Sequence, residues 1–443
     1  MVPWRKRILY IEKDLVQKFV SMSRDELEQK EFYGLGIAPT LLERIEDLGF
    51  KHPTPIQFKA IPIACSGEDV VGIAQTGTGK TLAFSIPMLQ QMSARGKKGL
   101  ILLPTRELAI QVEQTLVKLA GPLGLRTALL IGGTNPNPQK RKLREKPHVI
   151  IATPGRLIDM MNQRAANLSE IGVLVLDEAD RMLDMGFAPQ LKKILASVPK
   201  ERQTMLFSAT MPEQIATIAR EFMKSPLRVE VAPAGTTAER VVQEMFIVPK
   251  DEKVDLLKKL LTEYKGTVLV FCRTKHGASK LARSIRGMGH SSAEIHSNRS
   301  QNQRQEALRG FTNGKYRVMV ATDIAARGID VKNIELVVNF DLPDQLEDYV
   351  HRIGRTGRAG TAGKAISFAA PEQKGDIIQI ERLINTTLPV MTASGDLIEL
   401  KDRRGSARAP RSRSGGGGGR RYGGSGSSRP GRSRSRGPAK KRY

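Results

Sequence analysis

The chain contains little cysteine and no long apolar run. Its only two cysteines among 443 residues, Cys65 and Cys272, lie far apart and without ligand-type neighbours. This pattern favours reduced thiols in a cytoplasmic protein over a disulfide framework or a zinc site. No apolar run approaches the about 20 residues that span a bilayer. A basic N-terminus precedes the short apolar run ILYI, but Glu12 and Asp14 interrupt it and no small-residue cleavage site follows. We therefore expect neither secretion nor a membrane partner.

Acidic residues are almost missing from the last 43 residues, Lys401–Tyr443, where 15 lysines and arginines stand against Asp402 alone. This segment therefore holds +14 of the net charge of +26, and the first 400 residues hold +12. Charge of this size attracts polyanions. The mixture of arginine, glycine and tyrosine favours nucleic acid as the partner, with a simple solubility tail as the alternative. Because apolar periodicity ends near Ser394, we expect 394–443 to be disordered.

The remaining chain reads as two α/β domains, in keeping with roughly 150 residues per domain. Short apolar runs alternate with helix-like segments, which predicts parallel sheets covered on both faces. We place an N-terminal extension without assigned function at 1–31, a first domain at 32–231, a linker at 232–240 and a second domain at 241–393. The predicted strands are Val70–Ile73, Gly99–Leu103, Thr127–Ile131, Val149–Ala152, Val173–Leu176, Thr204–Phe207, Val268–Phe271, Arg317–Ala321, Leu336–Asn339 and Ala365–Ala369. Before them we expect a helix over Ile37–Leu48 and an extended Pro-x-Pro turn that ends at Gln57.

A glycine-rich turn follows the first apolar run, in the stretch Val70–Thr81 (VVGIAQTGTGKT). A strand, a glycine-rich turn and a helix N-terminus together bind phosphate through main-chain N–H groups. Lys80 would neutralise the outer phosphates and the Thr81 hydroxyl would ligate Mg²⁺. The general pattern has glycine where this chain has Ala74, so a plain strand–turn–helix corner with a solvated lysine is the alternative.

Two further clusters carry possible chemistry. Asp177-Glu178-Ala179-Asp180 directly follows the run VLVL, at the end of a buried strand where open α/β sheets bind ligands. Such acids hold Mg²⁺ or orient the attacking water in phosphate-loop NTPases, although two acids after a strand are more often a solvated loop. The second cluster, His351–Arg358 (HRIGRTGR), is either a solvated basic turn or a set of arginine fingers supplied by the second domain.

In this order the motifs resemble the DEAD-box family of ATP-dependent RNA helicases, in superfamily 2. The resemblance covers about residues 32–370, and the Ala74 spelling is the usual one in that family. Eleven motifs carry it: Phe32 with GFKHPTPIQ (49–57), AQTGTGKT (74–81), PTRELA (104–109), Gly132-Gly133, TPGR (153–156), DEAD (177–180), SAT (208–210), VFCRT (270–274), QNQR (301–304), ATDIAARGID (321–330) and HRIGRTGR (351–358).

The resemblance implies two tandem RecA-like α/β domains with an ATP site divided between them. By this likeness Phe32 stacks on adenine and Gln57 reads its edge, a task for which an amide offers both donor and acceptor. The phosphates and Mg²⁺ are assigned to the loop residues Ala74, Gln75, Thr76, Gly77, Thr78, Gly79, Lys80 and Thr81. Asp177 would hold the metal partly through water, Glu178 would act on the attacking water and Asp330 would touch the ribose. Arg355 and Arg358 would reach the γ-phosphate, and His351 would link the hydrolytic machinery across the cleft. Ser208 and Thr210 would couple the nucleotide site to the RNA side through hydrogen bonds with the acidic motif.

The same resemblance implies a single RNA strand read through its backbone, with 2′-hydroxyl contacts that distinguish RNA from DNA. The candidates in the first domain are Pro104, Thr105, Arg106, Gly133, Thr153, Gly155 and Arg156. Those in the second domain are Arg273, Thr274, Arg304, Thr322, Asp323, Arg327 and Gly328.

The expected activity is therefore RNA-stimulated ATP hydrolysis coupled to local, non-processive unwinding of RNA duplexes or remodelling of ribonucleoproteins, by a monomeric core. The alternative from another class is an ATP-timed RNA clamp or chaperone that acts mainly through the basic tail. A DNA-directed motor of the same superfamily fits less well, because it would lack the Gln57 motif and the full DEAD spelling. The RNA, the pathway and the bacterial or eukaryotic origin stay open.

Overall fold

The computed structural model describes residues 31–75, 77–231, 241–323, 331, 334–357 and 363–399. The predicted N-terminal extension (but for Glu31), the predicted linker and the tail from Leu400 on therefore lie outside the described residues. None of the helices within these ranges is long and apolar enough to cross a membrane.

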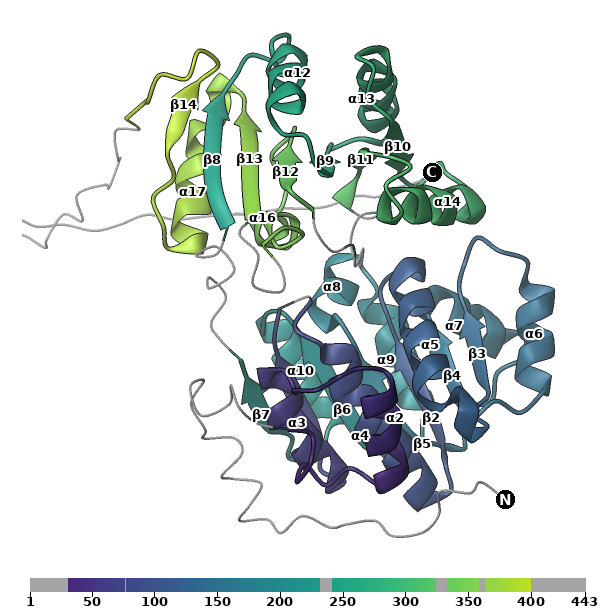
Figure 1. Ribbon diagram of the computed structural model, residues 1–443. Coiled ribbons are helices and arrows are strands. Elements are labelled where there is room, and N and C mark those ends of the chain that lie inside the picture. The colour runs from purple at the N-terminus through teal and green to yellow at the C-terminus, as the bar shows by residue number, and fades with distance from the viewer. Residues whose placement is uncertain are drawn as a thin grey trace, which may run out of the picture. The chain divides into compact units, whose positions relative to one another are not determined.

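The first domain is built on a sheet of seven parallel strands in the order β3-β4-β2-β5-β6-β1-β7 (Figure 1). The strands are β1 (Val70–Ile73), β2 (Lys98–Leu102), β3 (Thr127–Leu130), β4 (Val149–Ala152), β5 (Ile171–Leu176), β6 (Gln203–Ser208) and β7 (Leu227–Glu230). The helices are α2 (Pro39–Asp47), α3 (Pro55–Cys65), α4 (Lys80–Arg95), α5 (Arg106–Ala120), α6 (Pro136–Arg144), α7 (Pro154–Asn162), α8 (Ala179–Asp184), α9 (Ala188–Ser197) and α10 (Glu213–Phe222), with the short 3₁₀ helix η2 (Gly121–Leu123).

The second domain repeats the plan with parallel strands in the order β10-β11-β9-β12-β13-β8-β14. The strands are β8 (Val241–Ile247), β9 (Val268–Phe271), β10 (Ser292–Ile295), β11 (Val318–Ala321), β12 (Leu336–Asn339), β13 (Gly363–Ala369) and β14 (Val390–Thr392). The helices are α12 (Lys253–Glu263), α13 (Lys275–Gly287), α14 (Gln301–Thr312), α16 (Leu346–Ile353) and α17 (Lys374–Ile384), with η3 (Pro371–Gln373). The α/β class with two parallel sheets is confirmed.

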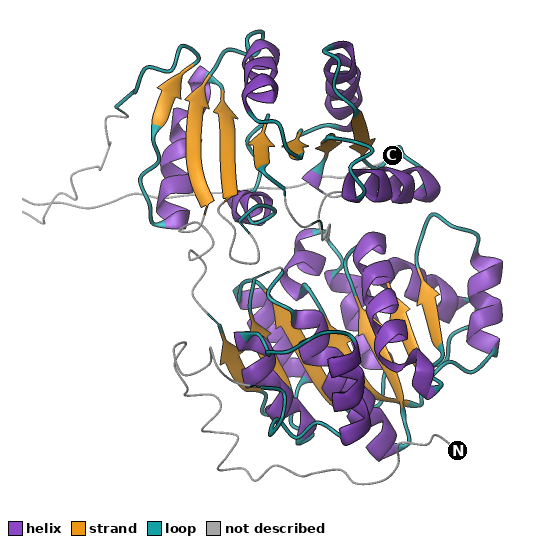
Figure 2. Ribbon diagram, viewed as in Figure 1, coloured by secondary structure: helices purple, strands orange, loops and turns teal. Residues whose placement is uncertain are grey.

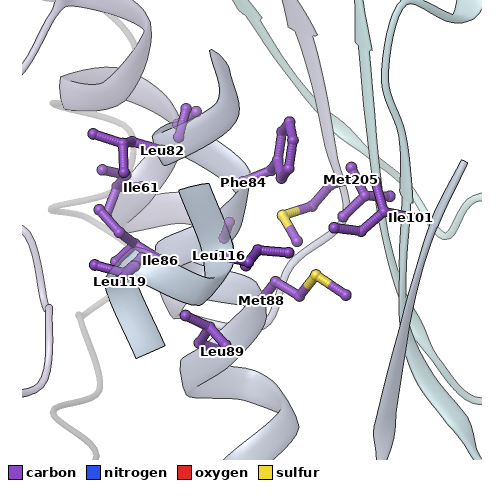
Figure 3. Close-up of a cluster of buried hydrophobic side chains, with 14 of the residues drawn as sticks. Ile61, Leu82, Phe84, Ile86, Met88, Leu89, Ile101, Leu116, Leu119 and Met205 are labelled. Atoms are coloured by element: carbon purple, nitrogen blue, oxygen red, sulfur yellow. The ribbon is translucent and has the colours of Figure 1, made fainter. Parts of the chain in front are cut away.

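Each sheet has a hydrophobic core on either face. Successive residues of a strand point to opposite sides, so Val70 of β1 belongs to one core cluster and Val71 to the other. Helices accordingly cover both faces (Figure 2). Figure 3 shows one of these cores, where Leu82 and Phe84 of α4 lie in a cluster with Met205 of β6. Burial on both faces explains why the central strands are continuous apolar runs.

Four strands were not predicted, namely β7, β8, β10 and β14. Three of them lie at sheet edges, and their sequences are polar or short. In β10 the polar residues Ser292 and Glu294 are both buried, so the hydrophobic pattern conceals the strand. The fold also extends beyond the predicted domain end at 393, because the Ile398 N–H donates to the Val390 carbonyl and Met391 forms an antiparallel bridge with Leu397.

Candidate functional site

The order of the strands divides the predicted motifs into two groups. Motifs follow the carboxyl ends of parallel strands, and these ends lie at one edge of the sheet. In the first domain the phosphate loop, the DEAD motif and the SAT motif follow β1, β5 and β6, which are neighbours. The predicted RNA motifs follow β2, β3 and β4, which occupy the other half of the same sheet. The fold therefore separates a nucleotide half from an RNA half.

The phosphate loop connects β1 to α4, as the glycine-rich pattern predicts. The Lys80 side chain is buried, and its Nζ donates to the Ala74 carbonyl at 2.9 Å. The Thr78 hydroxyl donates to the Gln75 carbonyl at 2.7 Å and closes the turn. Gly79 has φ +88°, and a Cβ there would collide with the amide of Gln57, so only glycine fits on both counts. The buried Nε2 of Gln75 has no hydrogen-bond partner among the described residues.

Gln57 lies in the first turn of α3, which corrects the predicted extended turn: the helix already begins at Pro55, since proline is favoured there. Its Oε1 accepts from the Thr54 N–H at 2.9 Å, and its Nε2 donates to the Gly79 carbonyl at 3.0 Å. The amide thus ties α3 to the phosphate loop. Phe32 is only 4% exposed and belongs to the hydrophobic core, so in this structure its ring is packed against protein and the predicted stacking stays a prediction.

The acidic motif forms a buried cluster after β5. Asp177 and Glu178 are 3% and 5% exposed. Glu178 adopts the left-handed conformation with φ 50°, which is uncommon for a residue other than glycine and directs the chain into α8. Its carboxylate pairs with Arg181 at 3.0 Å, within the same buried cluster. Arg181 was not among the predicted site residues.

Asp180 joins the acidic motif to the SAT motif after β6. Its Oδ2 accepts from the Ala209 N–H at 3.0 Å, the Thr210 N–H at 2.9 Å and the Thr210 hydroxyl at 3.0 Å. Its own N–H donates to the Ser208 hydroxyl at 3.2 Å. The predicted link between Ser208, Thr210 and the acidic motif is thus present as hydrogen bonds. Asp180, the last residue of the quoted DEAD motif, was not among the predicted site residues, although it makes these bonds.

Burial and charge shift the carboxyl groups in different directions. Burial raises the pKa of Asp177 to about 6, although the Lys80 ammonium counteracts it. Burial also acts to raise the pKa of Glu178, but the positive charges of Arg181, Lys80 and Arg355 outweigh burial and lower it. Glu178 is therefore ionised near neutral pH, as a group that polarises water must be. The charge of Arg355 in the second domain lies within electrostatic range of the first domain's acid.

The residues present fit a divalent cation bound together with phosphate. Asp177 is a buried carboxylate whose raised pKa reflects poorly compensated negative charge, which a cation would relieve. Thr81 supplies a hydroxyl in the first turn of α4. No group of three or more His, Cys, Asp or Glu side chains that could hold a metal occurs in the described part of the chain. Magnesium commonly takes one or two protein ligands and completes its shell with water and substrate phosphate, which matches this sparse set.

The second domain places His351 on α16 and Arg355 just beyond its end. Arg355 is 3% exposed, and its Nε donates to the His351 carbonyl at 3.2 Å. Burial lowers the pKa of His351 to about 4 against the opposing effect of Asp180, so the imidazole is neutral at pH 7. Both residues lie in electrostatic range of the acidic motif.

Arg352, between these residues, was not predicted as a site residue. It is 2% exposed and binds Asp323 with Nε–Oδ1 and Nη2–Oδ2 distances of 2.5 and 2.6 Å. Its Nη1 donates to the Asp341 carbonyl at 2.6 Å, and its guanidinium lies 5.0 Å from the centre of the Phe271 ring. The carboxylate of Asp323, predicted to contact RNA, is therefore engaged by the arginine of the ATP motif.

The predicted RNA residues of the first domain gather around three helix starts. Thr105 caps α5 by accepting from the Leu108 N–H at 3.3 Å. Gly133 has φ +72°, and a Cβ there would collide with the Arg106 guanidinium. Arg156 donates from Nη2 to the Thr134 carbonyl at 3.1 Å. Three further candidates differ in exposure: Pro104 and Thr153 are buried, whereas Gly155 is exposed with open space at its Cβ position.

In the second domain Arg273 and Thr274 follow β9, and Thr322 follows β11, the neighbouring strand. The Arg273 side chain is exposed, and Thr274 caps α13. The buried guanidinium of Arg304 pairs with Glu107 at 2.8 Å, and its predicted RNA contact stays a prediction. In this structure the guanidinium is used for an ion pair with the first domain and does not face solvent.

Five predicted residues lie outside the described residues, so the structure does not address them: Thr76, Arg327, Gly328, Asp330 and Arg358.

The described geometry is that of a two-domain phosphate-loop NTPase in which an arginine of the second domain, Arg355, lies within electrostatic range of Glu178. The chain belongs to the DEAD-box family of ATP-dependent RNA helicases. It matches the family model "DEAD/DEAH box helicase" over residues 54–218 and the model "Helicase conserved C-terminal domain" over residues 252–360.

Related proteins give the same result. The chain is 42% identical over 368 residues to the ATP-dependent rRNA helicase RRP3 of Debaryomyces hansenii, a match that covers 82% of the chain and 77% of that protein. It is 43% identical to the DEAD-box ATP-dependent RNA helicase CshA of Geobacillus kaustophilus, with 79% and 76% covered. It is 44% identical to DEAD-box ATP-dependent RNA helicase 30 of Arabidopsis thaliana, of which it spans only 59%.

Solved structures agree with this assignment. Saccharomyces cerevisiae Dbp5 bound to RNA and ADP BeF3 superimposes with a TM-score of 0.73 at 30% identity, over 82% of this chain and 96% of that one. Mss116p bound to single-stranded RNA and AMP-PNP does so with a TM-score of 0.75 at 28% identity, over 82% and 80%. The predicted family, RecA-like fold and class of enzyme are thereby confirmed, and the clamp alternative is not favoured.

Proposed function

We propose that this protein hydrolyses ATP in an RNA-dependent manner and uses the closure of its two domains to open short RNA duplexes. The observation that carries the proposal is the division of the first domain's sheet edge into a nucleotide half and an RNA half. Within the nucleotide half Asp180 joins the acidic motif to the SAT motif. In the second domain Arg352 of the ATP motif binds Asp323, a predicted RNA residue.

The nucleotide half supplies the residues for hydrolysis. Lys80 would neutralise the outer phosphates, and Thr81 with Asp177 would hold Mg²⁺, which balances phosphate charge when it is bound. Glu178, ionised at neutral pH, would orient and polarise the attacking water. Arg355 would stabilise the charge that develops on the transferred phosphoryl group. Because Arg355 belongs to the second domain, hydrolysis would depend on domain closure.

The RNA half supplies hydroxyls, main-chain N–H groups and arginines that fit phosphate and sugar better than base edges. Thr105 and Thr274 cap helices whose N-terminal N–H groups favour anions. Contacts of this kind carry little sequence information, so we propose broad RNA specificity, with ribonucleoproteins among the substrates. A strand bent in the closed cleft would no longer match an A-form partner, and the partner strand would dissociate.

Both halves of the ATP site belong to one chain, which supports action as a monomer. Its two cysteines are buried free thiols, which supports a cytoplasmic location.

The test is Glu178→Gln in the full chain. ATP binding should persist, while RNA-stimulated hydrolysis should fall by about a hundredfold or more, within the range of a lost general base. Turnover at the wild-type rate would contradict the role of Glu178. Deleting residues 401–443 serves as the companion experiment: stimulation by RNA should persist, with weaker and less salt-sensitive RNA binding.

A further inference from the structure

Helix α6 is a strongly basic element that contributes little to the core. Its nine residues include four cations, Lys140, Arg141, Lys142 and Arg144, and no acid. Gln139 is its only buried residue. Its one large apolar residue, Leu143, is only partly buried against the core. Since so narrow an apolar face stabilises a helix little, a further interaction contributes to holding α6 in place.

Gln139 provides this interaction at the open edge of the first sheet. Its Oε1 accepts from the Ile131 N–H at 3.2 Å, and its Nε2 donates to the Ile131 carbonyl at 3.0 Å and to the Thr134 hydroxyl at 2.7 Å. The Gln139 amide thus bonds both the N–H and the carbonyl of Ile131 at the end of β3, as the main chain of a neighbouring strand would. It fixes α6 to the loop that carries Gly133, and the Thr134 carbonyl of the same loop accepts from Arg156 at 3.1 Å. Two predicted RNA residues and the basic helix therefore belong to one rigid unit.

A hollow lies between α5, β3 and α6. Its volume is about 380 Å³, and Leu129, Pro138 and Pro147 form apolar parts of its wall. This size suits a single small ligand or a nucleobase. Arg126 and Lys142 also line it.

The surroundings of the hollow are positively charged. Besides the four α6 cations, Arg126 and Lys146 lie next to each other, since Arg126 Nη2 donates to the Lys146 carbonyl at 3.3 Å. Against these six cations stand the carboxyls of Glu113 and Glu145. Glu113 accepts from the Thr127 hydroxyl at 2.9 Å, and Glu145 pairs with Lys142 at 2.8 Å. The lining of the hollow is therefore balanced, with Arg126 and Lys142 against these two carboxyls. The surplus of about four positive charges comes from Lys140, Arg141, Arg144 and Lys146, which lie on and after α6 outside the lining, and such a surplus is the electrostatic footprint of a polyanion site.

We propose that α6 and this hollow bind the RNA strand where it extends beyond the cleft, with phosphates on the α6 cations and one nucleotide in the hollow. The proposal rests on the proposed function, because the path begins at Gly133. Strand β3 runs from Thr127 to Leu130, so the hollow beside Arg126 lies about 13 Å from the Gly133 end, at about 3.3 Å per residue. RNA that leaves the cleft there reaches the basic surface without a break.

The test compares two RNA lengths with the full-length protein. The short RNA is the shortest oligonucleotide that fully stimulates ATP hydrolysis, and the long RNA is the same oligonucleotide extended at either end. The variant combines Lys140→Gln, Arg141→Gln and Arg144→Gln, which removes three exposed or half-exposed charges without touching Gln139. The control combines Lys258→Gln, Lys259→Gln and Lys374→Gln, which removes three exposed charges from α12 and α17.

Binding is measured by fluorescence anisotropy with a non-hydrolysable ATP analogue over a series of salt concentrations. For the long RNA, the variant should bind about tenfold to a hundredfold more weakly, and the salt slope should fall by about two, at about 0.7 per phosphate contact. For the short RNA, affinity and stimulation should equal those of the wild type.

Two results would overturn the proposal. In the first, the α6 variant binds the long RNA as tightly as the wild type does, which would assign the charges to a protein partner or to solvation. In the second, the variant and the control weaken both RNAs equally, which would reflect net charge only. Failure of the proposed function is distinguishable, because the wild type would then show no stimulation of hydrolysis by either RNA.

Discussion

Asp180→Asn is the substitution that most directly tests how the acidic motif after β5 is joined to the SAT motif after β6. In the structure one carboxylate oxygen of Asp180 accepts three hydrogen bonds, from the Ala209 and Thr210 N–H groups and the Thr210 hydroxyl. The other oxygen accepts from the Arg181 N–H at 2.9 Å. Four donors thus converge on a group that is 4% exposed.

The side-chain amide of an asparagine cannot accept all four hydrogen bonds in either orientation. If its oxygen faces the loop after β6, its NH₂ group faces the Arg181 N–H, so two donors meet. In the reverse orientation its NH₂ group faces the three donors of Ala209 and Thr210. The remaining hydrogen bonds also lose their charge, and a hydrogen bond to a charged group contributes about 1.5–3 kcal/mol. We therefore expect the free energy of unfolding of the first domain to fall by about 2–4 kcal/mol.

The loss of unfolding free energy in Asp180→Asn depends on pH, because it requires Asp180 to be ionised in the wild type. The pKa of Asp180 is lowered from 3.8 because Lys80, His351 and the main-chain donors outweigh its burial. A lowered pKa stabilises the fold above the unfolded value and loses this stabilisation as pH falls through the folded value. Measurements near pH 7.5 therefore contain the whole effect.

The assay is urea unfolding of the wild type and of three variants, followed by ATPase and duplex-unwinding measurements. Thr210→Val removes only the hydroxyl bond and should cost about 1 kcal/mol. Asp47→Asn removes an exposed pair with Arg44 and should change stability by less than about 0.5 kcal/mol. In Asp180→Asn the number of strands separated per ATP hydrolysed should also fall. A loss of stability no larger than that of Asp47→Asn, with normal unwinding, would refute the reasoning.

Two further predictions concern the ATP site. Gly79→Ala should abolish ATP binding in a nucleotide-binding titration, because its methyl group would displace the Gln57 amide. The control is Gly124→Ala, at a similar φ of +86° but with open space at the Cβ position. It should lower the free energy of unfolding by about 1 kcal/mol and leave the ATP affinity unchanged. Because the pKa of His351 is lowered to about 4, its burial destabilises the fold as pH falls from 6.5 towards 4. Compared with the wild type, His351→Asn should therefore raise the free energy of unfolding by about 2 kcal/mol at pH 5 and leave it unchanged at pH 7.5. An equal rise at both pH values would show that the lowered pKa of His351 is not the reason.

Much of the nucleotide half could be read from the chain in advance, because its chemistry depends on neighbours in sequence. The turn from β1 into α4 needs glycine at position 79 and a lysine directly after it, and these residues are recognisable without a fold. The central strands were equally predictable from the sequence, since burial on both faces makes them uninterrupted apolar runs. Edge strands such as β10 were not, because their buried polar residues break the pattern.

The partners of the charged side chains could not be read in the same way. Glu107 and Arg304 are 197 positions apart, and Arg352 reaches Asp323 across 29. A sequence motif identifies an arginine, but it does not predict whether a carboxylate of another helix or strand pairs with that arginine. The amide of Gln57 shows the same limit, since its contact with Gly79, 22 positions away, depends on how α3 docks.

The amino-acid order alone was sufficient to indicate the α/β class, the family and the positions of the phosphate loop and the DEAD motif, because local periodicity and short motifs encode them. The sheet order was needed to divide the motifs of the first domain into a nucleotide half and an RNA half. Long-range packing was needed to bring Asp180 to the SAT motif and Arg352 to Asp323. Packing also fixed the basic helix α6 beside Gly133. Hydrogen bonds between distant segments form only after the hydrophobic cores have brought those segments together. For this reason they could not be predicted from the sequence.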